Sequence, residues 1–589
     1  MRLKSLSFIV LISFTVLIIS LANIQLNKYD FYKQLSDKNR IRLVPLPAAR
    51  GSIYDRYGRI LAEDKPLFVL SLAPDEFFRQ DSATIEQILK RLSEISGVPA
   101  AQIRERLNKR KTPSFVPVVI LSNLDKDKAL AIEEKSLGIG GLVVQVIPRR
   151  SYPYKDIAAH VIGYIGKVGP KEVGQRKRYG YHPPGWVGRA GVEKSADAYL
   201  MGEDGGRQIE VNHLGRQVRK LGIKLPRRGK DIYLTLDIEL QKVAYRLLTR
   251  EGLRGVIIVM EPHTGEILTM VSCPSFDPND FVEGDRKRIR RILHSRSSPL
   301  LNRAIAGLYP PGSTFKPLVA IAGLETKKIS PDSYLYCSGR HQIGNRFFYC
   351  WKRSGHHWLN VKGGLAYSCN VFFYKLGEKL GVDNLSKFAL LFGLGKKTGI
   401  NLPGEKRGLV PTRSWKYLTR RERWYQGETA LFSIGQGYIL VTPLQMARAV
   451  SVIANGGYLV RPRIIKRVTG SGKREAGEGN PYPVPRKLDI SLKNINIVRD
   501  GMVKAVEDKN GTAHGLKIDN LNIAAKTGTA QVEGKEANSW IVGFCPVRDP
   551  EIVFVILIEE GGTSTRRVSI AKELIEKWRE INCRLQASN

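Results

Sequence analysis

The sequence predicts an α+β protein that is held to a membrane by a single N-terminal helix. No charged residue occurs from Ser5 to Asn27, a run long enough for one membrane-spanning helix. Strand-like apolar segments occur at both ends of the C-terminal half, with helical patterns between them. We expect these two ends to share one antiparallel sheet with helices on its faces. A length of 589 residues indicates three or four folding units.

The composition is that of a folded and strongly basic protein. Hydrophobic residues make up 42% of the chain, which excludes a mainly disordered polypeptide. Lysine and arginine number 94 against 55 aspartates and glutamates, and such an excess attracts anionic partners. Basic runs such as residues 286–291 are not interleaved with aromatic residues and accompany no nucleic-acid-binding motif. We therefore expect solvated faces beside anionic lipid headgroups or an acidic polymer, and no nucleic acid as a partner.

The N-terminal segment determines the expected location. As an α-helix, residues 5–27 would extend about 34 Å, enough to cross a bilayer core of about 30 Å. A cleaved signal peptide is the alternative, but its apolar core is usually shorter, and a small-residue cleavage site is missing. Arg2 and Lys4 favour a cytoplasmic tail of residues 1–4. We expect a single-pass anchor in the cytoplasmic (inner) membrane, with the remaining chain on the extracytoplasmic or periplasmic side.

The remaining chain is expected to form two soluble domains, residues 28–230 and residues 231–589. The boundary is placed near 230 because residues 226–230 combine proline, glycine and basic residues. In the first domain, residues 29–49 are expected to be a helical stalk and linker. Residues 67–72 alternate between apolar and polar as a strand does.

The second domain is expected to begin with a strand and a helix around 239–250. Residues 255–271 contain two apolar runs joined by a glycine turn, which predicts a β-hairpin. Residues 539–558 predict a second hairpin in the same way, and an amphipathic helix is expected around 569–581.

A serine and a lysine follow a Pro-Pro-Gly turn in the second domain. Ser313 and Lys316 are three positions apart, so both side chains emerge on one face if a helix begins there. A partly desolvated lysine with a neutral amine can take the proton of a serine hydroxyl and so activate it as a nucleophile. Occurring alone, such a pair is more often an exposed helix turn.

Two further short motifs lie downstream. Ser368 and Asn370 precede an apolar stretch, where a hydroxyl can relay a proton and an amide can bind a substrate amide. The run Lys526-Thr-Gly-Thr529 predicts an edge strand whose glycine permits close approach and whose donors suit a substrate carboxylate. Alone, the first motif is typical of a helix cap and the second of an ordinary strand end.

Together the three motifs, in the order S-x-x-K, S-x-N and K-T-G, resemble the set found in penicillin-binding proteins and serine β-lactamases. Residues 50–62 resemble the R-G-x-I-x-D-R-x-G motif that opens the pedestal of class B penicillin-binding proteins, and residues 188–194 and 434–445 also resemble segments of that class. The run Trp351-Lys-Arg-Ser-Gly-His356 is similar to a segment of the class B proteins that act in cell elongation, rather than of those that act in cell division. The resemblance covers nearly the whole chain.

The resemblance implies an elongated, mixed and non-catalytic pedestal over residues 28–230. A transpeptidase domain, similar to serine β-lactamases and built on an antiparallel sheet flanked by helices, is implied over residues 231–589. The implied activity is that of a serine D,D-transpeptidase, which cross-links peptidoglycan stem peptides ending in D-Ala-D-Ala during cell-wall elongation. Such an enzyme releases D-Ala and is acylated by β-lactams.

Residue roles follow by the same resemblance. The implied catalytic residues are Ser313, Lys316, Ser368, Asn370 and Lys526, and the implied substrate-binding residues are Thr527, Gly528 and Thr529. Ser313 would be the nucleophile and Lys316 its base, while Ser368 would pass a proton to the leaving D-Ala. Backbone N–H groups of Ser313 and Thr529 would stabilise the oxyanion.

Two alternatives stay open on these motifs. A membrane-anchored β-lactamase or β-lactam sensor carries the same three motifs, although a pedestal of about 200 residues speaks against it. A non-catalytic scaffold for a glycan polymerase is the other, and the intact catalytic residues speak against it. No stretch resembles a glycosyltransferase domain, so the resemblance implies a SEDS-type, RodA-like membrane glycan polymerase and the elongation machinery as partners.

Three of the six cysteines lie within 33 residues of one another, and this cluster needs its own explanation. Cys337, Cys350, His356 and Cys369 could hold one structural zinc ion, although their spacing alone is weak evidence. Some members of the family that this chain resembles hold zinc through Asp, Asp, His and Cys, at positions that look like those of Cys337, Cys350, His356 and Cys369 here. A Cys337–Cys350 disulfide beside a free Cys369 is the alternative in an oxidising compartment. His357 is the competing imidazole, and the family pattern favours His356.

Overall fold

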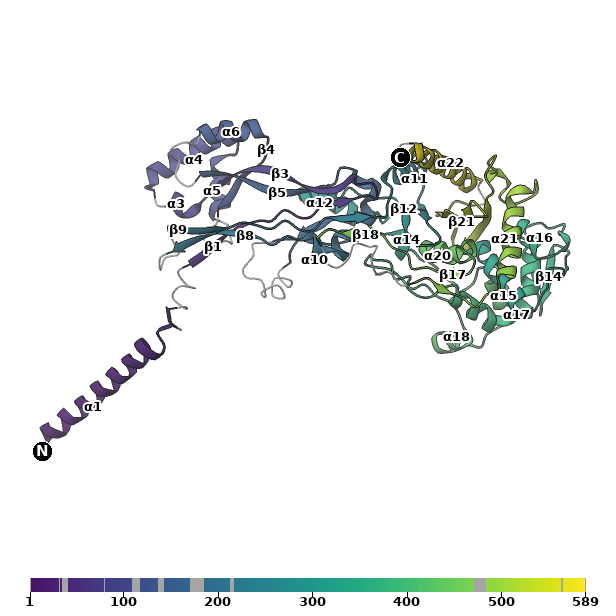
Figure 1. Ribbon diagram of the computed structural model, residues 1–589, viewed down its shortest axis with the longest axis horizontal. Coiled ribbons are helices and arrows are strands. Elements are labelled where there is room, and N and C mark those ends of the chain that lie inside the picture. The colour runs from purple at the N-terminus through teal and green to yellow at the C-terminus, as the bar shows by residue number, and fades with distance from the viewer. Residues whose placement is uncertain are drawn as a thin grey trace.

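The computed structural model describes residues 2–587 except for 31, 34–40, 79, 109–116, 136–141, 170–184, 212–216, 471–483 and 563–564. Figure 1 shows an elongated molecule in which the N-terminal helix and the C-terminal domain lie at opposite ends of the pedestal. The mixed α+β class predicted from the sequence is confirmed.

The N-terminal helix has the length and composition of a membrane anchor. Helix α1 (Arg2–Ala22) continues into η1 (Asn23–Asn27), and its apolar side chains are exposed. Within the described ranges, no other helix is long and apolar enough to cross a membrane.

The prediction of a helical stalk over residues 29–49 is wrong for its second half, which contains a strand. Strand β1 (Ile41–Leu46) lies antiparallel to β8 (Gly205–Val211), which also pairs with β9 (Gln217–Lys224). The reason is long-range pairing: the backbone groups of β1 find their partners about 160 residues later in the chain, and no local pattern reveals this. Residues 34–40 of the expected stalk lie outside the described residues.

A six-stranded sheet forms the long axis of the pedestal. Its order is β18 (Ile465–Val468), β10 (Ile232–Leu234), β2 (Ile53–Tyr54), β3 (Ile60–Leu72) and β4 (Val118–Leu124), and β5 (Leu142–Ser151) also pairs with β3. Helices α4 (Ser82–Ser96), α5 (Ala100–Asn108) and α6 (Lys126–Lys135) cover its distal end. Because β10 and β18 belong to the C-terminal half, this sheet continues from the pedestal into the second domain.

A buried ionic network closes the pedestal near this junction. Glu193 is fully buried between Arg50 and Arg150, with N–O distances of 2.7 and 2.6 Å. Arg50 also contacts Asp197 at 2.6 Å. Burial alone would raise the pKa of Glu193, but the two guanidinium groups hold that pKa below its ordinary value. The segments that carry Arg50 and Glu193 are therefore clamped together, although they are 143 residues apart.

The second domain is built on a five-stranded antiparallel sheet. Its order is β12 (Ile267–Cys273), β11 (Gly255–Met260), β22 (Ile552–Ile558), β21 (Lys535–Cys545) and β20 (Ala524–Val532). Both hairpins predicted from the sequence are confirmed, and they meet at β11 and β22. The strands at the two ends of the domain therefore share one sheet, as the sequence predicts.

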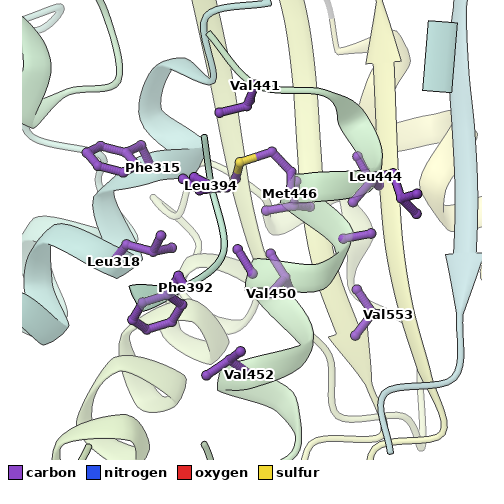
Figure 2. Close-up of a cluster of buried hydrophobic side chains, with 14 of the residues drawn as sticks. Phe315, Leu318, Phe392, Leu394, Val441, Leu444, Met446, Val450, Val452 and Val553 are labelled. Atoms are coloured by element: carbon purple, nitrogen blue, oxygen red, sulfur yellow. The ribbon is translucent and has the colours of Figure 1, made fainter. Parts of the chain in front are cut away.

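Helices cover both faces of this sheet. Helices α11 (Ile238–Thr249) and α22 (Arg566–Ala587) pack on one face. On the other face, α20 (Pro443–Ala454) separates the sheet from α15 (Lys316–Glu325). Figure 2 shows Met446 and Val450 of α20 between Val553 of β22 and Phe315, the residue directly before α15. This apolar layer fixes α15 relative to the sheet.

The remaining helices and strands complete the two domains. They are α3 (Pro74–Phe77), η2 (Lys155–Ala158), α7 (Ala159–Ile162), β6 (Ile165–Lys167), β7 (Trp186–Gly188), α9 (Gly191–Ser195), α10 (Asp197–Leu200), α12 (Asn279–Glu283), α13 (Arg286–Leu293), α14 (Arg303–Ala306), η4 (Gly312–Phe315), β13 (Leu335–Cys337), β14 (Arg340–Ile343), β15 (Arg346–Tyr349), β16 (His357–Leu359), α16 (Val361–Ala366), α17 (Asn370–Leu391), α18 (Arg413–Arg420), α19 (Gln426–Ser433), β17 (Tyr458–Leu459), β19 (Arg486–Lys487), α21 (Leu492–Glu507) and η5 (His514–Leu516).

Candidate active site and thiol–histidine cluster

The Ser313 turn is held between two other segments of the second domain. Ser313 lies in η4, which is one turn of 3₁₀ helix, and α15 begins at Lys316. The expected helix start is therefore present, but its first turn is a 3₁₀ turn, which is wound more tightly than an α-helix. The Gly312 N–H donates to the Gly435 carbonyl at 2.8 Å. Gly312 has φ +54°, and an added Cβ would lie 2.8 Å from the Thr529 carbonyl oxygen. The turn can therefore pack this closely only because Gly312 has no side chain.

Lys316 is fully buried beside the second motif. Its Nζ donates to the Asn370 Oδ1 at 2.7 Å, to the Ser368 carbonyl at 2.8 Å and to the Ser368 Oγ at 3.3 Å. Burial lowers the pKa of Lys316 to about 8, and negative charge on Cys369 and Cys350 opposes this only in part. A substantial share of the amine is thus neutral near physiological pH, as a base requires.

The second motif occupies a tight junction between two helices. Ser368 follows α16 with φ +51°, in the left-handed region, and Asn370 is the first residue of α17. The Cys369 Sγ caps α17 by accepting from the Phe372 N–H at 3.4 Å. Phe372 and Phe373 are buried, as the apolar stretch predicts. The Ser368 and Asn370 side chains are therefore oriented toward Lys316 by the start of a well-packed helix.

The third motif lies on the edge strand β20, as the sequence predicts. Lys526 is fully buried and donates to the Thr527 carbonyl at 2.9 Å. The pKa of Lys526 lies well below its ordinary value, mainly because the amine is buried. The positive charges of Lys316 and Arg567 lower it further. An added Cβ on Gly528 would lie 2.9 Å from the Thr314 Cγ2, so β20 lies directly against the Ser313 turn.

All three motifs are thus brought together from positions that are far apart in the sequence. Ser313 and Thr529 are partly exposed, whereas Lys316, Ser368 and Lys526 are buried. A nucleophile that solvent can reach, with a buried amine one turn away and a second hydroxyl beside that amine, can carry out acyl transfer.

A segment around Gly435, to which the sequence motifs assign no role, packs against the Ser313 turn. An added Cβ on Gly435 would lie 2.2 Å from the Gly312 carbonyl oxygen, and Gly435 has φ +72°. The two glycines therefore pack backbone to backbone. The Ile-Gly-Gln-Gly run around Gly435 could have indicated this contact, because it resembles a segment of class B penicillin-binding proteins. Its resemblance alone assigned it no structural role.

The four residues predicted to bind a metal converge in space. Their donor atoms all lie within 4.8 Å of one another. The His356 Nδ1 lies 3.7 Å from the Cys337 Sγ and 3.5 Å from the Cys350 Sγ, and the Cys350 and Cys369 Sγ atoms are 4.0 Å apart. Tetrahedral zinc with bonds of about 2.0–2.3 Å implies donor separations of roughly 3.5–3.8 Å, and the three separations given above lie in or near this range. All six cysteines are free thiols in the structure.

The choice between the two adjacent histidines follows from the geometry. His356 turns its Nδ1 to the thiols, and its buried Nε2 has no hydrogen-bond partner within the described part of the chain. His357 is exposed, with its ring 6.2 Å from that of Tyr336, and is not a member of the cluster. Because Cys369 lies between Ser368 and Asn370, the cluster is joined directly to the active-site motif.

Comparisons with known proteins agree with this architecture. Residues 45–234 match the model of the penicillin-binding protein dimerisation domain, and residues 255–577 match that of the penicillin-binding protein transpeptidase domain. A peptidoglycan D,D-transpeptidase MrdA of Acinetobacter baumannii is 36% identical over 97% of this chain and 86% of its own length.

Solved structures give the same result. Penicillin-binding protein 2 of Helicobacter pylori, in its complex with MreC, superposes with a TM-score of 0.80 at 28% identity over 92% of this chain and 99% of its own. A chain of a peptidoglycan synthase complex, solved in a study of coordinated polymerization and crosslinking, has a TM-score of 0.71 at 30% identity over 98% of this chain and 97% of its own. The chain therefore belongs to the penicillin-binding proteins, in their penicillin-binding protein 2 branch.

Proposed function

We propose that this protein is a membrane-anchored D,D-transpeptidase that cross-links peptidoglycan stem peptides during cell-wall elongation through an acyl-enzyme on Ser313. The observation that carries the proposal is the buried Lys316 amine, which lies within hydrogen-bond distance of both Ser368 and Asn370 one turn from Ser313. Its relatives named as D,D-transpeptidases, and the transpeptidase family model over this domain, support the same reaction.

In the proposed reaction, the Ser313 hydroxyl attacks the carbonyl of the penultimate D-Ala while the neutral Lys316 amine takes its proton. Backbone N–H groups of Ser313 and Thr529 stabilise the tetrahedral oxyanion. The D-Ala amine leaves with a proton that passes through Ser368. An acceptor amine from a second stem peptide then attacks the ester, forms the new amide and frees the Ser313 hydroxyl.

The donor peptide is held by the edge strand and by Asn370. Thr527, Gly528 and Thr529 lie on β20, where an extended peptide can pair with the unpaired side of the strand. The Lys526 and Thr529 side chains supply donors for the terminal carboxylate. A β-lactam carries a comparable carboxylate and a reactive amide, so it enters the same site and acylates Ser313.

Labelling with a fluorescent penicillin tests this proposal. The wild type should form one slowly released adduct, Ser313→Ala should form none, and Ser195→Ala, at an exposed serine of the pedestal, should label as the wild type does. Rapid turnover of the penicillin would support a β-lactamase instead. An unlabelled wild type would favour a non-catalytic scaffold.

We also propose that Cys337, Cys350, His356 and Cys369 hold one structural zinc ion. The converging donor atoms support this proposal, because three cysteine sulfurs and one imidazole nitrogen form a ligand set that zinc prefers. Four protein ligands close the coordination shell, so zinc would cross-link this region and would not activate water. The alternative Cys337–Cys350 disulfide would leave Cys369 free, and mass spectrometry of the purified protein distinguishes the two.

We further propose that α1 anchors the protein in the cytoplasmic membrane, with both domains on its outer side. Residues 45–234 and 255–577 match the two penicillin-binding protein domains, and the proposed peptidoglycan substrate lies outside the cytoplasm. A SEDS-type, RodA-like polymerase is the proposed partner, since the family models that match this chain do not include a glycosyltransferase. Copurification from membranes with such a polymerase, lost on replacing α1 by an unrelated anchor, would test this.

A further inference from the structure

The segment that carries three of the four cluster residues also presents exposed aromatic side chains. Tyr336 on β13 and Trp358 on β16 are cross-strand partners, and their rings lie 5.3 Å apart. Trp358 is 65% exposed, Tyr336 is 40% exposed, and the nearby Tyr334 is 57% exposed. We call Tyr334, Tyr336 and Trp358 the aromatic ridge. Aromatic surface of this kind, left in water on a folded domain, commonly marks a binding site.

The aromatic ridge is rigidly connected to the active site. Alternation along the short ribbon places Cys337 and Leu359 on its buried side, while Tyr336 and Trp358 face solvent. Cys337 contacts the same thiol–histidine cluster as Cys369. In addition, Lys375 of α17 donates to the Tyr336 carbonyl at 2.9 Å. The ribbon therefore keeps a fixed position relative to Asn370, where α17 begins.

The segment that carries the aromatic ridge has an excess of positive charge, which favours an anionic ligand. Within residues 331–360 the cationic side chains are Arg340, Arg346, Lys352 and Arg353, and Asp332 is the single carboxylate. All four cations are exposed. A ligand that carries carboxylates would therefore be attracted to this surface.

We propose that the aromatic ridge binds the sugar chain of a peptidoglycan strand whose stem peptide is in the Ser313 site. This inference rests on the proposed function. The C–H face of a pyranose ring is apolar and weakly positive, and it packs on the negative face of an aromatic ring. Three rings match a few sugar units in size, whereas a stable protein partner usually covers about 800 Å² on each side. On an intact strand the stem-peptide carboxylates supply the matching charge, and on a strand stripped by an amidase the freed lactyl carboxylates supply it.

Glycan strands stripped of their stem peptides by an amidase are the probe, titrated into the full-length protein in detergent micelles. Trp358→Phe keeps an aromatic face and should bind the strands with nearly the wild-type Kd. Trp358→Leu keeps apolar volume without that face, and its Kd should rise about tenfold. Tyr336→Leu, on the neighbouring strand, should weaken binding similarly. Tyr417→Ala, at an exposed tyrosine of α18, should leave the Kd unchanged.

Fluorescent-penicillin labelling of each variant separates this inference from the proposed function. Labelling should be unchanged, because the ridge residues belong to none of the three catalytic motifs. Equal glycan affinity of the wild type, Trp358→Leu and Tyr336→Leu would overturn the inference and leave the ridge as a protein contact, while the transpeptidase proposal would stand. A wild type that is not labelled on Ser313 would instead overturn the proposed function, whatever the glycan affinity.

Discussion

The Lys316 Nζ lies 2.7 Å from the Asn370 Oδ1 and donates a hydrogen bond to it, although 54 residues separate the two in the sequence. This contact joins α15, which follows Ser313, to α17, which starts at Asn370. It orients the amine, and burial around it keeps the amine partly neutral.

Lys316→Arg should reduce the rate of penicillin acylation by at least about 100-fold. Guanidinium does not deprotonate in proteins, so the charge is retained but the base is lost. Lys328→Arg, at an exposed lysine after α15, is the matched control and should acylate normally. Stopped-flow measurement of adduct formation checks this, and acylation within a few-fold of wild type would show that the base lies elsewhere.

The acylation rate should rise with pH and level off above about pH 9. The pKa of Lys316 is lowered to about 8, so the neutral fraction grows from about one tenth at pH 7 to about nine tenths at pH 9. The wild-type rate at subsaturating penicillin should therefore increase several-fold over this interval, with its midpoint near pH 8. A rate that does not change between pH 7 and pH 9 would contradict a titrating Lys316.

Cys350→Ser and His356→Ala should lose the proposed zinc ion and unfold at a lower temperature. Both should also label poorly with penicillin, because Cys369 positions Ser368 and Asn370. Cys583→Ser is the control, since this thiol is exposed and outside the cluster. Metal analysis and thermal unfolding measure the effect. Fully active, metal-free protein with a Cys337–Cys350 disulfide would contradict the prediction.

Glu193→Gln should destabilise the pedestal by about 3–5 kcal/mol, because it removes the fully buried carboxylate between two buried guanidinium groups and leaves Arg50 with Asp197 and Arg150 with Asp64. The pKa of Glu193 is lowered in the folded state. Its contribution is therefore complete above its unfolded pKa, near 4.5, and is lost as the pH falls through the lower folded pKa. Glu94→Gln, at an exposed glutamate, should change the unfolding temperature little. Thermal unfolding at pH 7 of both variants decides the point.

Much of the second domain could be predicted from local signals. The hairpins at 255–271 and 539–558 have continuous apolar runs on both sides of a turn, so their strands form wherever the domain places them. The helix that became α22 shows its apolar period in the sequence. Strand β1 could not be predicted, because the strand that it pairs with in the described part of the chain is the distant β8.

By itself, the sequence determined the membrane anchor, the α+β class and the short motifs at Ser313, Ser368 and Lys526, since each is a contiguous pattern of residue types. The tertiary structure decided how these motifs meet. The pKa of Lys316 depends on burial by α17 and its neighbours. The selection of His356 over His357 depends on which ring faces Cys337 and Cys350. Burial and convergence are properties of the packed chain, so they appear only when segments far apart in the sequence come into contact.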